Sequence, residues 1–163
     1  MKFSACNQFR GRIEALMPAF DRIEVAIALN AEDRLIASVS RRSSEALELR
    51  PGADIDVLFT ANDVLVGTGT PVQIGASNVF CGRIAAISEY PACVEVMMST
   101  RSGLTLHAQV AAAALHHLDL CLGAPVYFVV RSVQLLLATP VKAYRQERPA
   151  ALCVPPRTRI HSS

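Results

Sequence analysis

Histidine and cysteine are the residue types of this chain that most readily bind metals or act in catalysis, and their spacing predicts neither role. His116 and His117 are adjacent, so on a helix their side chains point about 100° apart and cannot easily chelate one metal together. We interpret them as exposed polar residues of a helix. Cys81 and Cys93 could meet across neighbouring strands, but a zinc site needs four ligands and no second pair is evident. The sequence therefore predicts no metal-cation site.

No pattern of catalytic residues is apparent either. No serine or cysteine lies in a nucleophile motif, and Gly67-Thr68-Gly69-Thr70 lacks the lysine of a phosphate-binding loop. We interpret that segment as a linker. The five cysteines, an odd number without a CxxC pair, are typical of reduced thiols in a cytosolic protein. We therefore expect a cytoplasmic protein that is not an enzyme and has no organic cofactor.

The composition argues against nucleic-acid and membrane partners. Of the 163 residues, 52% are hydrophobic and 18% are charged, with a net charge of +2. Residues 141–163 carry a net charge of +4, so the rest of the chain is slightly acidic and offers no cationic groove for a nucleic acid. No apolar run approaches the roughly 20 residues that span a bilayer. A small chain this apolar favours a homo-oligomer, in which more hydrophobic surface is buried.

The chain contains the same segment twice, at an offset of 71 residues and without gaps. The two copies share 18 identities in 66 aligned positions; Asn7, for example, recurs as Asn78. Self-similarity of this kind indicates a duplicated structural unit. We therefore expect a first domain over residues 1–70 and a second over residues 71–140. Residues 141–163, which are basic and contain proline, are expected to form a disordered tail.

Each copy has the same pattern of elements. In the first copy, apolar residues in alternation predict strands, and a short helix with Ser43 as its N-cap precedes the fourth strand. The expected strands are residues 9–16, 23–29, 34–39, 55–59 and 64–66. The second copy matches, with a helix over residues 111–118 and final strands over residues 126–130 and 135–137. We therefore expect a mainly β protein of two tandem OB-like barrels, each five-stranded with one short helix.

Both copies also carry a glycine inside their first predicted strand. These residues are Gly11 and Gly82. Glycine at such a position usually marks either a β-bulge or a close approach of two backbones. Both arrangements are compatible with the sequence.

The repeated unit resembles the Mop domain of the molbindins, which is also called the TOBE domain. The opening Ser4-Ala5-Cys6-Asn7 is similar to the start of the family pattern, and Glu24-Val25 and Glu95-Val96 match its acidic-valine strand. The helix and its exit are similar at Ser43, Leu47, Leu49 and Gly52, and the last turn at residues 60–66. The resemblance covers residues 2–140, and it implies tandem Mop-type barrels.

This resemblance also implies a function. Molbindins are small cytoplasmic proteins that bind molybdate or tungstate between domains and subunits of a trimer, as a store or buffer. The anion is a tetrahedral dianion, which backbone N–H groups, hydroxyls and a few cations can hold without any metal–protein bond. The resemblance implies these oxyanion-binding residues: Ser4, Ala5, Cys6, Asn7, Ser40, Thr60, Ala61, Ser77, Asn78, Arg131 and Ser132.

Several positions depart from the family pattern and leave other interpretations open. The arginine expected before each asparagine is Cys6 in the first copy and Ser77 in the second, and the lysine of the last turn is Thr60 and Arg131. One expected cation of four therefore remains. The alternative function is a regulatory or protein-interaction module with degenerate anion sites. Asn7 and Asn78 are equally compatible with capping of local backbone.

Overall fold

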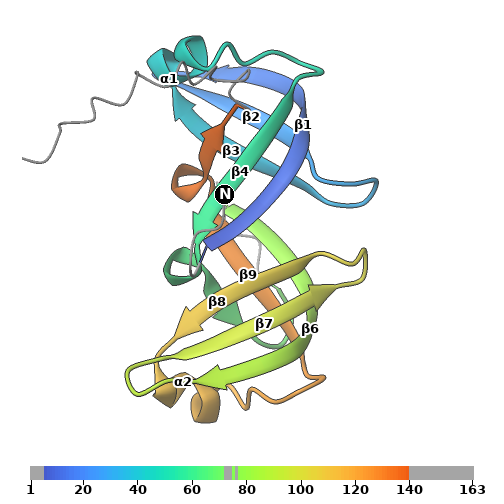
Figure 1. Ribbon diagram of the computed structural model, residues 1–163, viewed down its shortest axis with the longest axis vertical. Helices are drawn as coiled ribbons and strands as arrows, with labels where there is room; N and C mark the ends of the chain where they lie inside the picture. Colours follow the sequence, from blue (N-terminus) through green and yellow to red (C-terminus); the bar gives the residue numbers. More distant parts are fainter. Residues whose placement is uncertain (1–5, 72–74, 76, 140–163) are drawn as a thin grey trace, which may run out of the picture.

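The computed structural model describes residues 6–71, 75 and 77–139, which form two five-stranded antiparallel sheets. The sheets follow one another along the long axis of the molecule, one in each half (Figure 1). The tail over residues 141–163 lies outside the described residues. Within the described ranges, no helix is long and apolar enough to cross a membrane. The expected fold class, mainly β with one short helix before the fourth strand of each copy, is confirmed.

The two halves have matching elements. In the first copy these are β1 (Cys6–Ala19), β2 (Arg22–Ala28), β3 (Arg34–Ser40), α1 (Arg41–Ala46), β4 (Asp54–Thr60), the 3-10 helix η1 (Ala61–Asp63) and β5 (Leu65–Gly67). In the second copy they are β6 (Ser77–Glu89), β7 (Val94–Thr100), β8 (Thr105–Val110), α2 (Ala112–His117), β9 (Pro125–Arg131), η2 (Ser132–Gln134) and β10 (Leu136–Ala138). Most of the observed strands begin or end one to three residues beyond the predicted bounds.

The cores consist mainly of aliphatic side chains. Alternate residues of β2 and β7 point inward, so that Val25, Ile27 and Val96 are fully buried. One phenylalanine of each fourth strand, Phe59 in β4 and Phe128 in β9, is also fully buried. Burial of this kind on one face of each strand is the dominant source of stability for two such small sheets.

The fifth strands are exchanged between the two halves. The sheet orders are β10-β4-β1-β2-β3 and β5-β9-β6-β7-β8, and Figure 1 shows β10, in orange, within the sheet of the first half. The prediction that each copy supplies all five strands of its own barrel is therefore wrong for the fifth strands. Because the copies repeat, each fifth strand meets an equivalent partner in the other half: Leu65 lies opposite Val129, and Leu136 lies opposite Leu58.

The N-cap of α1 also differs from the expectation. Ser40, not Ser43, is the N-cap: its backbone is extended, and its hydroxyl accepts a hydrogen bond of 3.0 Å from the N–H of Ser43. The cap precedes its partner by three residues, which is the usual geometry of serine caps. In the second copy Ala111 occupies this position and makes no side-chain cap bond. The side-chain cap of the short helix is therefore present only in the first half.

The strand glycines mark close backbone approaches. A Cβ atom at Gly11 would lie 2.5 Å from a methyl carbon of Ile27 and 2.7 Å from the carbonyl oxygen of Ala28. At Gly82 the Cβ atom would collide with the carbonyl oxygen of Ser99. The β-bulges of β1 and β6 lie a few residues further along each strand. Of the two arrangements compatible with the sequence, the close approach is therefore the one at the glycines.

Gly82→Ala is expected to lower the free energy of unfolding by about 2 kcal/mol, because the new methyl group meets rigid backbone and the strands must move apart. Gly75→Ala is the matched control, since a Cβ atom at Gly75 would have no atom of the described residues within 4 Å. Urea denaturation of both variants measures the difference. Equal stability of the two variants would contradict the close packing at Gly82.

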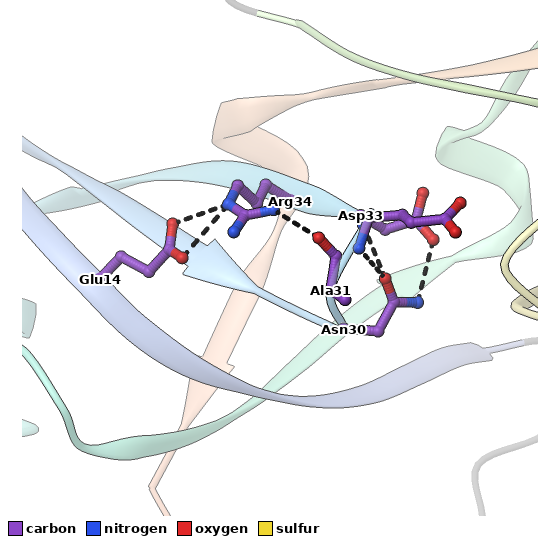
Figure 2. Close-up of polar contacts among 6 residues, drawn as sticks. Glu14, Asn30, Ala31, Asp33 and Arg34 are labelled. Carbon is purple, nitrogen blue, oxygen red and sulfur yellow. Dashed lines mark hydrogen bonds and ion pairs between the residues drawn. The ribbon is translucent and has the colours of Figure 1, made fainter.

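The hairpin loops of the two halves meet. In the β2–β3 loop, the Asn30 side chain accepts backbone hydrogen bonds and donates one of 3.0 Å to Asp33, while Arg34 donates to Glu14 (Figure 2). The same loop reaches the β7–β8 loop, where the Ser102 hydroxyl accepts from Asn30 and donates to Asp33. Polar contacts therefore hold the halves together at these loops, in addition to the exchanged strands.

Candidate functional site

Two equivalent asparagines join each first strand to the third strand of the other half. The Asn78 side chain accepts a hydrogen bond of 2.7 Å from the N–H of Ile36 and donates one of 3.0 Å to the carbonyl oxygen of the same residue. Asn7 makes the same pair of bonds, of 2.7 and 2.9 Å, with His107. The local backbone capping considered in the sequence analysis does not describe these contacts, because the bonded residues are 42 and 100 positions away.

These asparagines are already committed to protein partners. The amide nitrogen of Asn78 donates a second bond of 3.3 Å to the carbonyl oxygen of Val130, so both of its hydrogens are used. Both side chains are buried, at 2% exposed for Asn7 and 8% for Asn78. Each asparagine therefore fixes the position of a turn relative to the facing strand of the other half.

The last turn of the second copy brings four of the predicted residues together. Ser77 is paired with Arg131 and Asn78 with Val130 across β6 and β9. Ser132 follows in η2 and is buried, whereas Arg131 is exposed. Since η2 packs against β3, this turn lies beside the strand that ends at Ser40.

The equivalent turn of the first copy brings together Cys6, Asn7, Thr60 and Ala61. Cys6 is paired with Thr60 across β1 and β4, and Ala61 is buried in η1, which packs against β8. The Thr60 hydroxyl donates a hydrogen bond of 2.9 Å to the carboxylate of Asp63. Ser4 and Ala5 lie outside the described residues.

The two turns differ in charge. The first has the carboxylate of Asp63 bonded to Thr60 and no cation at the predicted position. The second has Arg131 at the position of Thr60 and the neutral Gln134 at the position of Asp63. Within residues 6–71, 75 and 77–139, no carboxylate forms an ion pair with Arg131. An anion is therefore favoured electrostatically at the second turn and disfavoured at the first.

A cavity of about 330 Å³ lies next to the second turn. Its polar side is formed by Arg22 and three serines, Ser40 among them, and its apolar side by Leu47 with residues of η2 and β10. Ser40 was predicted as a site residue, but Arg22 was not. The register of the β2–β3 hairpin, which places Arg22 directly opposite Ser40, is the signal that would have identified it.

The cysteines and histidines have no shared site in the described part of the chain. The β6–β7 register places Cys81 beyond the Gly82–Thr100 pair, whereas Cys93 precedes the Val94–Glu89 pair at the other end of the hairpin. They therefore cannot meet, contrary to one possibility raised by the sequence. His116 and His117 are exposed on α2, and no group of three metal-ligating side chains occurs among the described residues.

Known proteins are similar in sequence to both halves of the chain. Residues 4–66 match the TOBE domain. The molybdenum transport protein ModE of Azotobacter vinelandii is 31% identical over 138 residues, which are 85% of this chain and 51% of ModE. The molybdenum-pterin-binding protein MopB of Rhodobacter capsulatus is 26% identical over 141 residues, 86% of this chain and 52% of MopB. The chain thus spans about half the length of the curated relatives it matches.

A solved structure shares the fold over its whole length. It is the cytoplasmic molybdate-binding protein ModG, in a form with molybdate bound. It superposes with a TM-score of 0.81 and 29% sequence identity, covering 86% of this chain and 100% of the ModG chain. Taken with the duplicated sequence, the TOBE match of the first copy and the likeness to ModG show that the chain has the tandem Mop-domain, or TOBE-domain, fold.

Proposed function

We propose that this protein binds molybdate or tungstate inside the cell, in the cytoplasm, as a store or buffer. The observation that carries the proposal is the fold shared with molybdate-bound ModG along the whole ModG chain. Relatives in the same family are named for molybdenum transport and binding, so binding without catalysis is the activity that fits. The alternative, an interaction module with degenerate anion sites, has no observation of its own in its favour.

The turn of the second copy is the part of the predicted site best suited to an oxyanion. Arg131 supplies a positive charge that no described carboxylate neutralises, and Ser132 and Ser40 lie on the neighbouring η2 and β3. Backbone N–H groups at Ser4, Ala5 and Cys6 are proposed to complete the site. Asn7 and Asn78 then position the turns rather than bind the anion, and Ser77 acts through its strand pairing with Arg131.

A homotrimer is proposed as the functional assembly. Large apolar side chains remain exposed on the fifth strands, with Leu65 at 61% and Leu136 at 66%, and on their neighbours Ile36 and Val133. Exposed large apolar residues are typical of surfaces that a second copy covers. Sites between subunits would then form only in the assembled protein.

Isothermal titration of the full chain with molybdate tests the proposal, with sulfate as the reference anion. We expect binding to molybdate that exceeds binding to sulfate. Arg131→Ala is expected to weaken the molybdate affinity at least about tenfold, because a charge-assisted hydrogen bond to a dianion is lost. Arg50→Ala, which removes another exposed arginine, serves as the control.

Two outcomes would contradict parts of the proposal. Folded protein that gives no heat with molybdate or tungstate would contradict the function itself. An unchanged affinity in Arg131→Ala would leave the function intact and remove Arg131 from the site.

A further inference from the structure

The cavity beside α1 has one polar side, which could bind an anion, and one apolar side. Its volume is about 330 Å³, near the lower end of the range of about 300–1,000 Å³ for small-molecule sites. Arg22 and hydroxyl groups form the polar side. Apolar side chains form the opposite side of the cavity, which is open to solvent at Val133 and Leu136. The apolar side chains are Leu47, Val133, Leu135, Leu136 and Leu137.

Arg22 is held in place by Ser38. Its Nε donates a hydrogen bond of 2.7 Å to the Ser38 hydroxyl, and its Nη2 donates one of 2.6 Å to the Ser38 carbonyl oxygen. A guanidinium group carries five N–H donors, and within the described residues Nη1 has no protein acceptor. The group is therefore oriented by two bonds and still has donors to offer.

The charge of Arg22 is not neutralised by an ion pair in the described residues. Other arginines of the same sheet do have carboxylate partners: Arg10 lies 3.1 Å from Asp56, and Arg34 lies 3.1 Å from Glu14. Glu24 is on the same strand as Arg22, but it forms no ion pair with it and does not line the cavity. A half-buried cation of this kind attracts an anionic ligand.

The hydroxyl groups add donors. Ser40 donates its hydrogen to the Ser43 hydroxyl at 2.9 Å and accepts from the Ser43 backbone N–H. The Ser43 hydroxyl, which thus accepts from Ser40, retains its own hydrogen for a ligand. Ser38, which accepts from Arg22, can donate in the same way. Arg22, Ser38 and Ser43 therefore all offer hydrogen-bond donors on the polar side of the cavity.

The second half lacks this arrangement at equivalent positions. Cys93 replaces Arg22, Gln109 replaces Ser38, Ala111 replaces Ser40 and Ala114 replaces Ser43. The amide nitrogen of Gln109 donates to the Cys93 sulfur at 2.7 Å, so these two groups bond each other. The molecule thus contains an internal control, in which the same scaffold has no cation and no hydroxyl.

We infer that the cavity of the first half is a tetrahedral-oxyanion site in which Arg22 is the charged ligand. Its donors are the guanidinium Nη1 and the hydroxyls of Ser38 and Ser43, and Ser40 orients Ser43. This inference rests on the proposed function. It adds one cation, Arg22, to a first copy in which the cations of the family pattern are replaced by Cys6 and Thr60. Only the first half is expected to contain such a site.

Equilibrium dialysis of the full chain against molybdate, with the metal measured directly, tests the inference. Arg22→Gln is expected to weaken binding at this site by about tenfold to a hundredfold, because a charge-assisted bond is replaced by a neutral one. Arg34→Gln is the matched control, because Arg34 is also a β2–β3 hairpin arginine but does not line the cavity. Circular dichroism confirms that each variant is folded.

A second variant provides a gain of binding. Cys93→Arg combined with Gln109→Ser, Ala111→Ser and Ala114→Ser places the same polar groups at the equivalent positions of the second half, and it should raise the number of anions bound per chain. This variant decides the question if Arg22→Gln does not fold.

The outcomes separate this inference from the proposed function. Two results would overturn only the site at Arg22 and leave the proposed function intact. One is molybdate binding that is the same in the wild type and in Arg22→Gln. The other is a four-residue variant that folds but binds no additional anion. Binding of sulfate or phosphate but not molybdate or tungstate, lost in Arg22→Gln, would support the site and overturn the proposed anion. A wild-type protein that binds none of these anions would overturn both.

Discussion

A chain that ends at Gln134 is expected to be less stable than one that ends at Thr139 by about 4 kcal/mol or more. The five residues lost include β10 and Leu135, which is only 3% exposed. Deletion of one buried leucine side chain typically costs about 2–5 kcal/mol, and loss of β10 also leaves the outer edge of β4 unpaired. Since a domain of this size is stable by only about 5–15 kcal/mol, the shorter chain will be close to unfolding. Urea denaturation measures the difference.

The location of the damage tests the strand exchange. β10 lies opposite Asp56, Val57 and Leu58 of β4 in the first half, although the deletion is in the second copy of the sequence. Hydrogen exchange should therefore become faster in β4 and change less in β9. Faster exchange in β9 with β4 unaffected would mean that β10 belongs to its own half. The chain that ends at Thr139 is the control, because it removes residues 140–163 from both samples.

The repeat and its strands could be predicted because they depend on local pattern. Alternation of apolar residues, as in β2, is enough to specify a strand with one buried face. The fold class follows from the order of these elements. The resemblance of both copies to one domain added the expected function.

The strand exchange could not be predicted, because the repeat itself makes the two pairings equivalent. Leu65 and Leu136 are identical and lie 71 residues apart, and the residues that they face, Val129 and Leu58, are similar in size and polarity. No local signal distinguishes pairing within a half from pairing between halves. The choice of pairing depends on η1 and η2. Each of these helices packs against a strand of the other half, η1 against β8 and η2 against β3, and so places the following fifth strand there.

The candidate site could be predicted from the sequence only in part, for a similar reason. Ser40, Arg131 and Ser132 are predicted site residues because of their positions in a family pattern, whereas Arg22 stands outside that pattern. Its role depends on a cross-strand register and on a cavity closed by β10 from the other copy. A residue whose importance depends on the exchange cannot be identified before the exchange is known.

Asn78→Leu is expected to lower the free energy of unfolding by about 3 kcal/mol, because a side chain of similar size can no longer bond the backbone of Ile36. The N–H and carbonyl of Ile36 and the carbonyl of Val130 each lose a partner. The bonds join the two halves, so exchange of the Ile36 amide hydrogen should also become faster. Asn62→Leu is the control, since Asn62 is exposed and makes no side-chain hydrogen bond within the described residues.

Asn78→Asp separates the loss of hydrogen bonds from the loss of packing. At neutral pH a carboxylate at this position faces the carbonyl oxygens of Ile36 and Val130, so the variant should be less stable than Asn78→Leu. Burial beside these oxygens raises the pKa of the introduced carboxyl above its unfolded value of about 3.9. The added instability is therefore absent below that pH and develops as the pH rises through the folded pKa. Equal stability of the two variants at pH 3 and pH 7 would show that Asn78 does not bond these carbonyls, and the proposed positioning of the second turn would lose its basis.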